Sequence, residues 1–174
     1  GQKLGWQVFD QEVLEYMAQD AVVRQGVLDS LAPAVAAWVE QRLELLLREQ
    51  NLSQHPAIQN LARVVLALGA QGEAVMVGRG AGFILPRETT LHVRLLAPLP
   101  ERIAYMSQWL RLPVEEAAEM VRLRDERRGE FLRTHFHRGG DVHPYDMLLN
   151  TSLLSEDVCA ELIALAARAR SAQP

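Results

Sequence analysis

Two groups of residues in this 174-residue chain have types and spacings suited to binding phosphate. The first is the glycine-rich run Gly78–Gly82, in which Gly78 and Gly80 let the backbone approach a ligand closely and Arg79 supplies a planar fork of hydrogen-bond donors. The run does not match G-x-G-x-x-G, and the phosphate loop G-x-x-x-x-G-K-[ST] occurs nowhere in the sequence. A tight strand-to-helix turn that carries a surface arginine is an equally good interpretation.

The second group is a cluster of six arginines over 17 residues. Its members are Arg122, Arg124, Arg127, Arg128, Arg133 and Arg138. On a helix, Arg124 and Arg128 share a face, with Arg127 beside them. Guanidinium groups placed in this way stabilise the charge on a transferring phosphoryl group, by about 2–4 kcal/mol for each well-placed donor. Because acidic residues are interspersed, a solvated helix with internal ion pairs is the alternative interpretation.

The remaining side chains that could be reactive are predicted to have structural roles. The spacing of His135, His137 and His143 near Asp141 lacks the paired ligands of a metal centre, so a polar loop and no metal site are expected. The other side chains are predicted to lie in the core or to pack under the lid: Cys159, His92, Trp38, Trp109 and Phe83.

The composition narrows the class of protein. Hydrophobic residues make up 49% of the chain and charged residues 23%, which excludes intrinsic disorder. The net charge of −4 argues against a nucleic-acid binder, and no apolar run is long enough to span a membrane. A single cysteine and the lack of a visible signal peptide favour the cytoplasm. The composition leaves the oligomeric state open.

Strands and helices are predicted to alternate along the chain. Short apolar segments predict strands over Trp6–Asp10, Glu73–Val77, Thr90–Leu96 and Tyr145–Asn150. Helical periodicity covers Gln11–Ala70 with a polar break at Asn51–Pro56, then Glu101–Leu110, Pro113–His135 and Ser155–Arg170. This alternation predicts an α/β fold, with a parallel sheet and helices on both faces.

Parallel sheets bind ligands beyond the carboxyl ends of their strands. Asp10, Gly78–Gly82 and Asn150 all follow predicted strands. The predicted fold alone therefore places a ligand-binding site at the edge of the sheet where these strands end.

Taken in order, several segments resemble the cytidylate kinase-like family of nucleoside monophosphate kinases. These segments are Leu4–Asp10, Val77–Leu85, His92–Leu99 with Arg102, Arg124–Arg128 and Tyr145–Thr151. The resemblance implies a phosphate-loop kinase fold in a single domain, residues 1–174, with an acceptor-binding helical region at 11–70 and an arginine-rich lid at 111–144. It also implies that ATP, with Mg²⁺, donates its γ-phosphoryl group to a nucleoside monophosphate or a similar small acceptor.

The resemblance also implies roles for individual residues. Asp10, Gly78, Arg79 and Gly80 would bind the acceptor. The lid arginines Arg124, Arg127 and Arg128 would be catalytic, gripping the phosphates, while Arg102, Asn150 and Thr151 would lie at the donor nucleotide. If Arg79 is exposed, its replacement by alanine should cost no more than about 0.5 kcal/mol of stability.

The chain departs from the family pattern at several positions. Cytidylate kinases proper carry an aspartate where this chain has Gly80, and their lid continues with an aspartate and an arginine near Gly129 and Phe131. The acceptor is therefore left open.

The family's first strand, phosphate loop and first helix would precede Leu4, and the strand would lie between the segments Glu73–Val77 and Thr90–Leu96. We therefore expect about 25 further residues before Gly1 in the natural protein and weak or no kinase activity from these residues alone. A non-catalytic binding or regulatory module derived from a kinase is the alternative.

Overall fold

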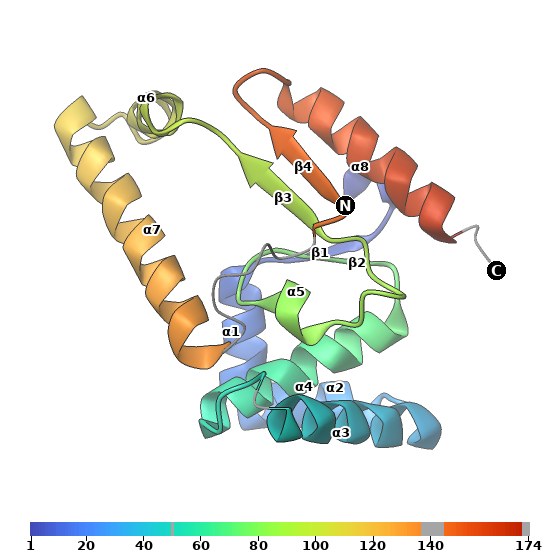
Figure 1. Cartoon of the computed structure of the whole chain (residues 1–174). Coiled ribbons are helices and arrows are strands. Elements are labelled where there is room, and N and C mark those ends of the chain that lie inside the picture. Colours follow the sequence, from blue (N-terminus) through green and yellow to red (C-terminus); the bar gives the residue numbers. More distant parts are fainter. Residues whose placement is uncertain (50, 137–144, 172–174) are drawn as a thin grey trace. The chain divides into compact units, whose positions relative to one another are not determined.

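The computed structural model describes residues 1–49, 51–136 and 145–171, which form two compact units (Figure 1). Within this described part, unit 1 comprises residues 1–90 and 132–136, and unit 2 comprises residues 91–131 and 145–171. Three of the residues predicted to form a polar loop, His137, Asp141 and His143, lie outside the described residues, as does Arg138.

Unit 1 is mostly helical, as the periodicity of its sequence predicts. Its elements are the 3₁₀ helix η1 (Gln2–Leu4), β1 (Gln7–Phe9), α1 (Gln11–Gln19), α2 (Ala21–Asp29), α3 (Pro33–Arg48), α4 (Pro56–Gln71), β2 (Ala74–Met76) and α5 (Ala81–Ile84). The predicted helical region thus consists of four helices. Asp20 separates the first two, because its carboxylate accepts hydrogen bonds from the backbone N–H groups of Val22 and Val23 and so caps α2.

Helix α4 forms the centre of unit 1. Eight of its residues are buried, from Ile58 to Leu68, and it packs against α1, α2, α3, α5 and β2. A helix that is apolar on most of its circumference is expected to be buried in this way. The helix continues to Gln71, one residue beyond the predicted boundary, and Gly69 lies against Leu85, whose side chain leaves no room for a Cβ atom there.

Unit 2 contains the remaining strands and most of the remaining helical residues. Its elements are β3 (Val93–Leu96), α6 (Leu99–Leu110), α7 (Val114–His135) as far as residue 131, β4 (Met147–Asn150) and α8 (Glu156–Ser171). The carboxylate of Asp146 accepts the backbone N–H of His92 at 2.7 Å and pairs with Arg170 at 3.3 Å, which fastens the start of β3 to α8.

Two of the predicted core side chains lie in unit 2 as expected. Cys159 in α8 is 4% exposed, and His92 at the start of β3 is also 4% exposed. Trp109 in α6 is different, since it is 70% exposed and stacks on Tyr105 with the ring centroids 6.2 Å apart. Of the two places predicted for Trp109, the core is therefore wrong, because Tyr105 and Trp109 lie one helical turn apart on an outward face of α6.

The strands form two parallel pairs instead of the single sheet that the sequence predicts. β1 pairs with β2 in the register Val8↔Val75, and β3 pairs with β4 in the register Leu95↔Leu149. In the described residues β2 and β3, between which a further strand is expected, belong to different sheets. Apolar strand residues that a larger parallel sheet would cover are exposed, including Val8 at 50% and Leu148 at 60%.

None of the helices within the described ranges is long and apolar enough to cross a membrane.

Candidate functional site

The residues predicted to bind the acceptor lie together at one edge of unit 1. The backbone N–H of Val77 donates to the carbonyl of Phe9 at 2.9 Å, so the pairing of β1 and β2 extends to the points where both strands end. Asp10 follows one strand and Gly78 the other, and a Cβ atom built on Gly78 would lie 3.8 Å from Cβ of Gln11. The structure therefore brings Asp10 and the run Gly78–Gly80 together, as the sequence predicts.

Arg79 lies in this edge in an unusual conformation. Its backbone φ is 48°, in the left-handed region that non-glycine residues rarely adopt, and such conformations concentrate at functional sites. Its side chain is only 19% exposed and forms an ion pair with Glu15 of α1. The alternative interpretation of this run, a turn that carries a surface arginine, therefore does not describe Arg79, whose side chain is mostly covered and paired.

Glu15 is a site residue that the sequence analysis missed. It lies one helical turn after Gln11, on the face of α1 that begins beside the end of β1. That spacing is the one signal that could have placed a carboxylate next to Arg79.

An aromatic pair fills the space beside Gly80. The φ of Gly80 is 71°, and a Cβ atom built there would lie 2.3 Å from the ring of Phe136. Phe136 is 2% exposed and stacks on Phe83, with the ring centroids 5.2 Å apart. No side chain fits at position 80 in this arrangement, so residue 80 can offer a ligand its backbone alone.

Asp10 is the carboxylate in this edge that could take part in binding Mg²⁺. It is exposed, and its Oδ1 accepts the backbone N–H of Val13 at 2.9 Å, which caps α1. In the parts of the chain that the structure describes, no group of three or more His, Cys, Asp or Glu side chains could hold a metal. Mg²⁺ in phosphate-transferring sites commonly keeps one or two carboxylates together with phosphate oxygens and water, and Asp10 fits that limited role.

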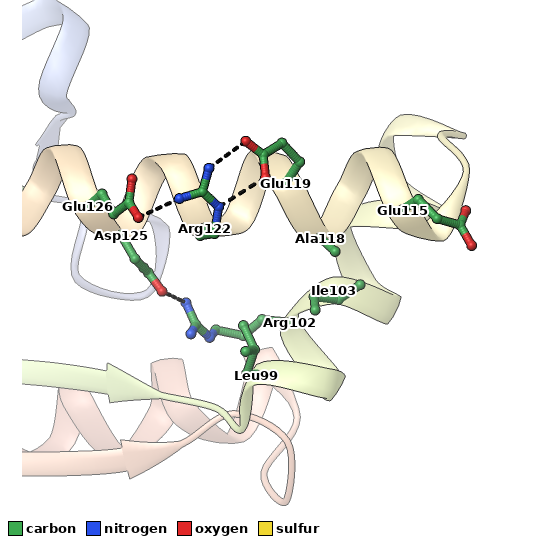
Figure 2. Close-up of a pocket in the computed structure, with 9 residues that line it drawn as sticks. All are labelled: Leu99, Arg102, Ile103, Glu115, Ala118, Glu119, Arg122, Asp125 and Glu126. Atoms are coloured by element: carbon green, nitrogen blue, oxygen red, sulfur yellow. Dashed lines mark hydrogen bonds and ion pairs between the residues drawn. The ribbon is translucent and has the colours of Figure 1, made fainter.

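In unit 2, the carboxylate of Asp125 joins two of the predicted site arginines, and Figure 2 shows its contact with Arg102. Nη1 of Arg102 in α6 donates to Oδ2 of Asp125 in α7 at 2.7 Å, and Nη2 of Arg128 donates to Oδ1 of the same carboxylate. Partial burial of Asp125 opposes its ionisation, but the hydrogen bonds from Arg102 and Arg128 outweigh it and hold the pKa of this carboxyl below its usual value. Asp125 therefore stays charged between two cations.

The other arginines of the cluster differ from one another. Arg122 donates to Glu119 at 2.6 and 2.9 Å and to Glu126 at 2.5 Å. The hydrogen bond with Glu119 is the main reason why the pKa of Arg122 rises, and it lowers the pKa of Glu119. The interpretation as a solvated helix with internal ion pairs thus describes Arg122 well, whereas Arg124 and Arg127 are exposed.

A hollow of about 600 Å³ lies between α6 and α7. Figure 2 shows its apolar side, formed by Leu99, Ile103 and Ala118, and the ion pairs of Arg102 and Arg122 at its other side. Glu115, Glu119, Asp125 and Glu126 also line it. Carboxylates outnumber guanidinium groups along this lining.

The predicted donor residues at the end of β4 close a turn. Both the backbone N–H and the hydroxyl of Thr151 donate to the carbonyl of Leu96, at 2.8 and 3.2 Å. Oδ1 of Asn150 accepts the backbone N–H and the hydroxyl of Ser152, at 3.0 and 2.7 Å. These contacts place Asn150 and Thr151 beside the end of β3, and their role toward a donor nucleotide stays a prediction.

The site residues thus form two groups, one in each unit. Asp10, Gly78, Arg79 and Gly80 belong to unit 1, and Arg102, Arg124, Arg127, Arg128, Asn150 and Thr151 belong to unit 2. That both groups hold one ligand stays a prediction.

Comparison with known proteins agrees with the resemblance seen in the sequence. Residues 1–153 match the family model described as "Cytidylate kinase-like family". The chain is also similar in fold to the crystal structure of an uncharacterized protein from Eubacterium ventriosum ATCC 27560, with a TM-score of 0.66 and 17% identity, over 97% of this chain and 89% of that chain. No curated protein matches the sequence.

Proposed function

Because the chain belongs to the cytidylate kinase-like family, we propose that it binds phosphorylated small molecules and transfers the γ-phosphoryl group of ATP to a nucleoside monophosphate or a similar acceptor. The observation that carries this proposal is the shared edge of β1 and β2, where Asp10 and Arg79 follow neighbouring parallel strands. Ligands of open parallel sheets bind at such an edge.

Arg79 is proposed to hold the phosphate of the acceptor. A guanidinium group binds phosphate through paired, charge-assisted hydrogen bonds, and the backbone of Gly78 allows close approach. Glu15 is the present partner of Arg79, so an incoming phosphate would share or replace that carboxylate. Mg²⁺, when bound near Asp10, would neutralise part of the phosphate charge.

The lid arginines are proposed to hold the transferring group. Phosphoryl transfer depends mainly on positioning and on stabilising charge that spreads over the phosphoryl oxygens. Arg124 and Arg127 are exposed and available for this task, and Arg128 lies in the ion-pair network with Asp125. Arg102, Asn150 and Thr151 are proposed to contact the donor nucleotide.

Phe136 bears on the choice of acceptor. Since its ring occupies the space beside Gly80, no side chain at that position can recognise a base. We therefore propose that the phosphate, and not a base contacted by residue 80, supplies most of the acceptor's binding energy. Several monophosphates should then bind with similar affinity.

The binding part of the proposal is tested on the chain itself by calorimetric titration with AMP, CMP, GMP, UMP and ATP. Arg79→Ala should abolish monophosphate binding. Arg63→Ala is the matched control, because Arg63 also lies in unit 1 and pairs with a glutamate, Glu40, at 2.9 Å. Equal loss in both variants, or no binding by the unmodified chain, would refute a site at Arg79.

Turnover is tested with a coupled assay for ADP release. A second candidate function, a non-catalytic binding or regulatory module, is favoured by the internal pairing of Arg122 with Glu119 and Glu126. Nucleotide binding without turnover of any monophosphate would support the module over the enzyme.

A further inference from the structure

Asp125 of α7 forms an ion pair with Arg102 of α6 and so links the two helices (Figure 2). Each of its oxygens accepts from a different arginine: Oδ2 from Arg102 at 2.7 Å, and Oδ1 from Arg128. Arg102 lies in the first turn of α6, and Arg128 lies in α7, three residues after Asp125. The carboxylate is thus the shared partner of two guanidinium groups from two helices.

Such sharing has an electrostatic consequence. Two guanidinium groups repel each other, and a carboxylate between them compensates the repulsion and leaves the trio with one net positive charge. The side chains of Arg102 and Asp125 are about one third exposed, at 34% and 35%, whereas that of Arg128 is 68% exposed. Arg128 therefore keeps donors toward solvent while one of its nitrogens is fixed.

We propose that Asp125 is a positioning residue, which holds Arg102 and Arg128 as one preorganised pair for successive phosphates of a polyphosphate donor. This inference rests on the proposed function. Arginine suits the role because its planar fork can donate to the carboxylate with one nitrogen and to phosphate oxygens with another. Positioning of this kind lowers the cost of ordering long side chains when the ligand binds.

The competing interpretation makes the opposite prediction. If Asp125 merely occupied the arginines in place of phosphate, then removing its charge would strengthen phosphate binding. If Asp125 positions the arginines, then removing its charge lets Arg102 and Arg128 separate and weakens binding. The sign of the change therefore distinguishes the two interpretations.

The experiment compares Asp125→Asn with Glu126→Gln by calorimetric titration with inorganic tripolyphosphate and with ATP. Both substitutions remove one negative charge at adjacent positions of α7, but Glu126 pairs with Arg122, which keeps Glu119 as a second partner. Asp125→Asn should weaken binding roughly tenfold or more relative to Glu126→Gln. Equal or tighter binding by Asp125→Asn would overturn the inference.

Two further measurements separate positioning from a general structural effect. Asp125→Asn should weaken binding much less in an Arg102→Gln background than in the unmodified chain, because the carboxylate acts through Arg102. In ¹H–¹⁵N spectra of the arginine Nε–Hε groups, tripolyphosphate should shift the Arg102 and Arg128 signals together in the unmodified chain, and the Arg102 signal should no longer respond in Asp125→Asn. Additive losses, or an Arg102 signal that responds in both proteins, would overturn the inference.

The outcome also separates this inference from the proposed function. If the unmodified chain binds neither tripolyphosphate nor ATP, then the proposed function fails in unit 2 and the inference fails with it. If the unmodified chain binds and Asp125→Asn equals Glu126→Gln, then the inference alone fails.

Discussion

Replacing Gly80 by alanine tests the packing at the predicted acceptor edge. The new methyl group meets two obstacles: a backbone φ of 71°, and the Phe136 ring 2.3 Å away. The left-handed conformation costs about 1–2 kcal/mol for an alanine. The collision adds about 1–3 kcal/mol, since Phe136 is 2% exposed and stacked on Phe83, with little room to move.

The two costs can be separated because the chain offers a matched glycine. Gly5 has the same φ of 71°, but a Cβ atom built there has no neighbour within 4 Å. Gly5→Ala should therefore lose only about 1–2 kcal/mol. Gly80→Ala should lose about 2–5 kcal/mol in total, which lowers the melting temperature by on the order of 10 °C for a chain of this size.

The assay is thermal unfolding followed by circular dichroism, with urea titration to obtain the free energy of unfolding. In the double variant Gly80→Ala with Phe136→Ala, the total loss should be smaller than the sum of the single losses by about 1–3 kcal/mol, because the shortened side chain removes the collision. If Gly80→Ala costs no more than Gly5→Ala, then the ring of Phe136 does not lie against Gly80 and the reasoning is refuted.

Three other predictions follow from contacts described above. Arg79→Ala should destabilise unit 1 by about 1–2 kcal/mol, because Glu15 loses its partner. The free energy of unfolding is measured by urea titration. An unchanged value would mean that the ion pair contributes nothing to stability. Asp20→Ala should cost about 1 kcal/mol by the same measurement, because two backbone N–H groups of α2 lose their cap, and Asp29→Ala at the end of that helix is the control. The pKa of Asp125 is lower in the folded protein than in the unfolded chain, so its contribution to stability is present above the unfolded value of about 4 and is lost as the pH falls through the folded pKa. Melting temperatures measured between pH 7 and pH 3 should therefore fall less steeply for Asp125→Asn than for the unmodified chain, and parallel curves would contradict the assignment.

Local patterns were enough to predict where most strands and helices lie in the sequence. The strand that ends at Asp10 and the strand before Gly78 are marked by short apolar runs followed by polar or glycine residues, and both are confirmed within a few residues. Their pairing in parallel then brings the predicted binding residues of unit 1 to one edge. What local patterns could not give is the number of strands in each sheet, because pairing depends on which strands are neighbours in space.

The side-chain partners within the site were beyond prediction for a related reason. Glu15 pairs with Arg79, and Phe136 packs on Gly80, although each pair is far apart in the sequence and neither carries a local motif. Trp109 illustrates the opposite error, because residue type alone suggested burial and the orientation of α6 exposes it. Spacing predicts which residues share a face of a helix, but not what that face contacts.

The central position of α4 has a consequence for how unit 1 opens. Because this helix is surrounded by α1, α2, α3, α5 and β2, its backbone cannot meet solvent until several neighbours have left it. The amide hydrogens of its buried stretch, Leu61–Leu68, should therefore exchange with deuterium only through global unfolding of the unit. The ends of β1 and β2, with Asp10 and Arg79, lie outside that helix and can fluctuate locally without disturbing the slowest-exchanging core.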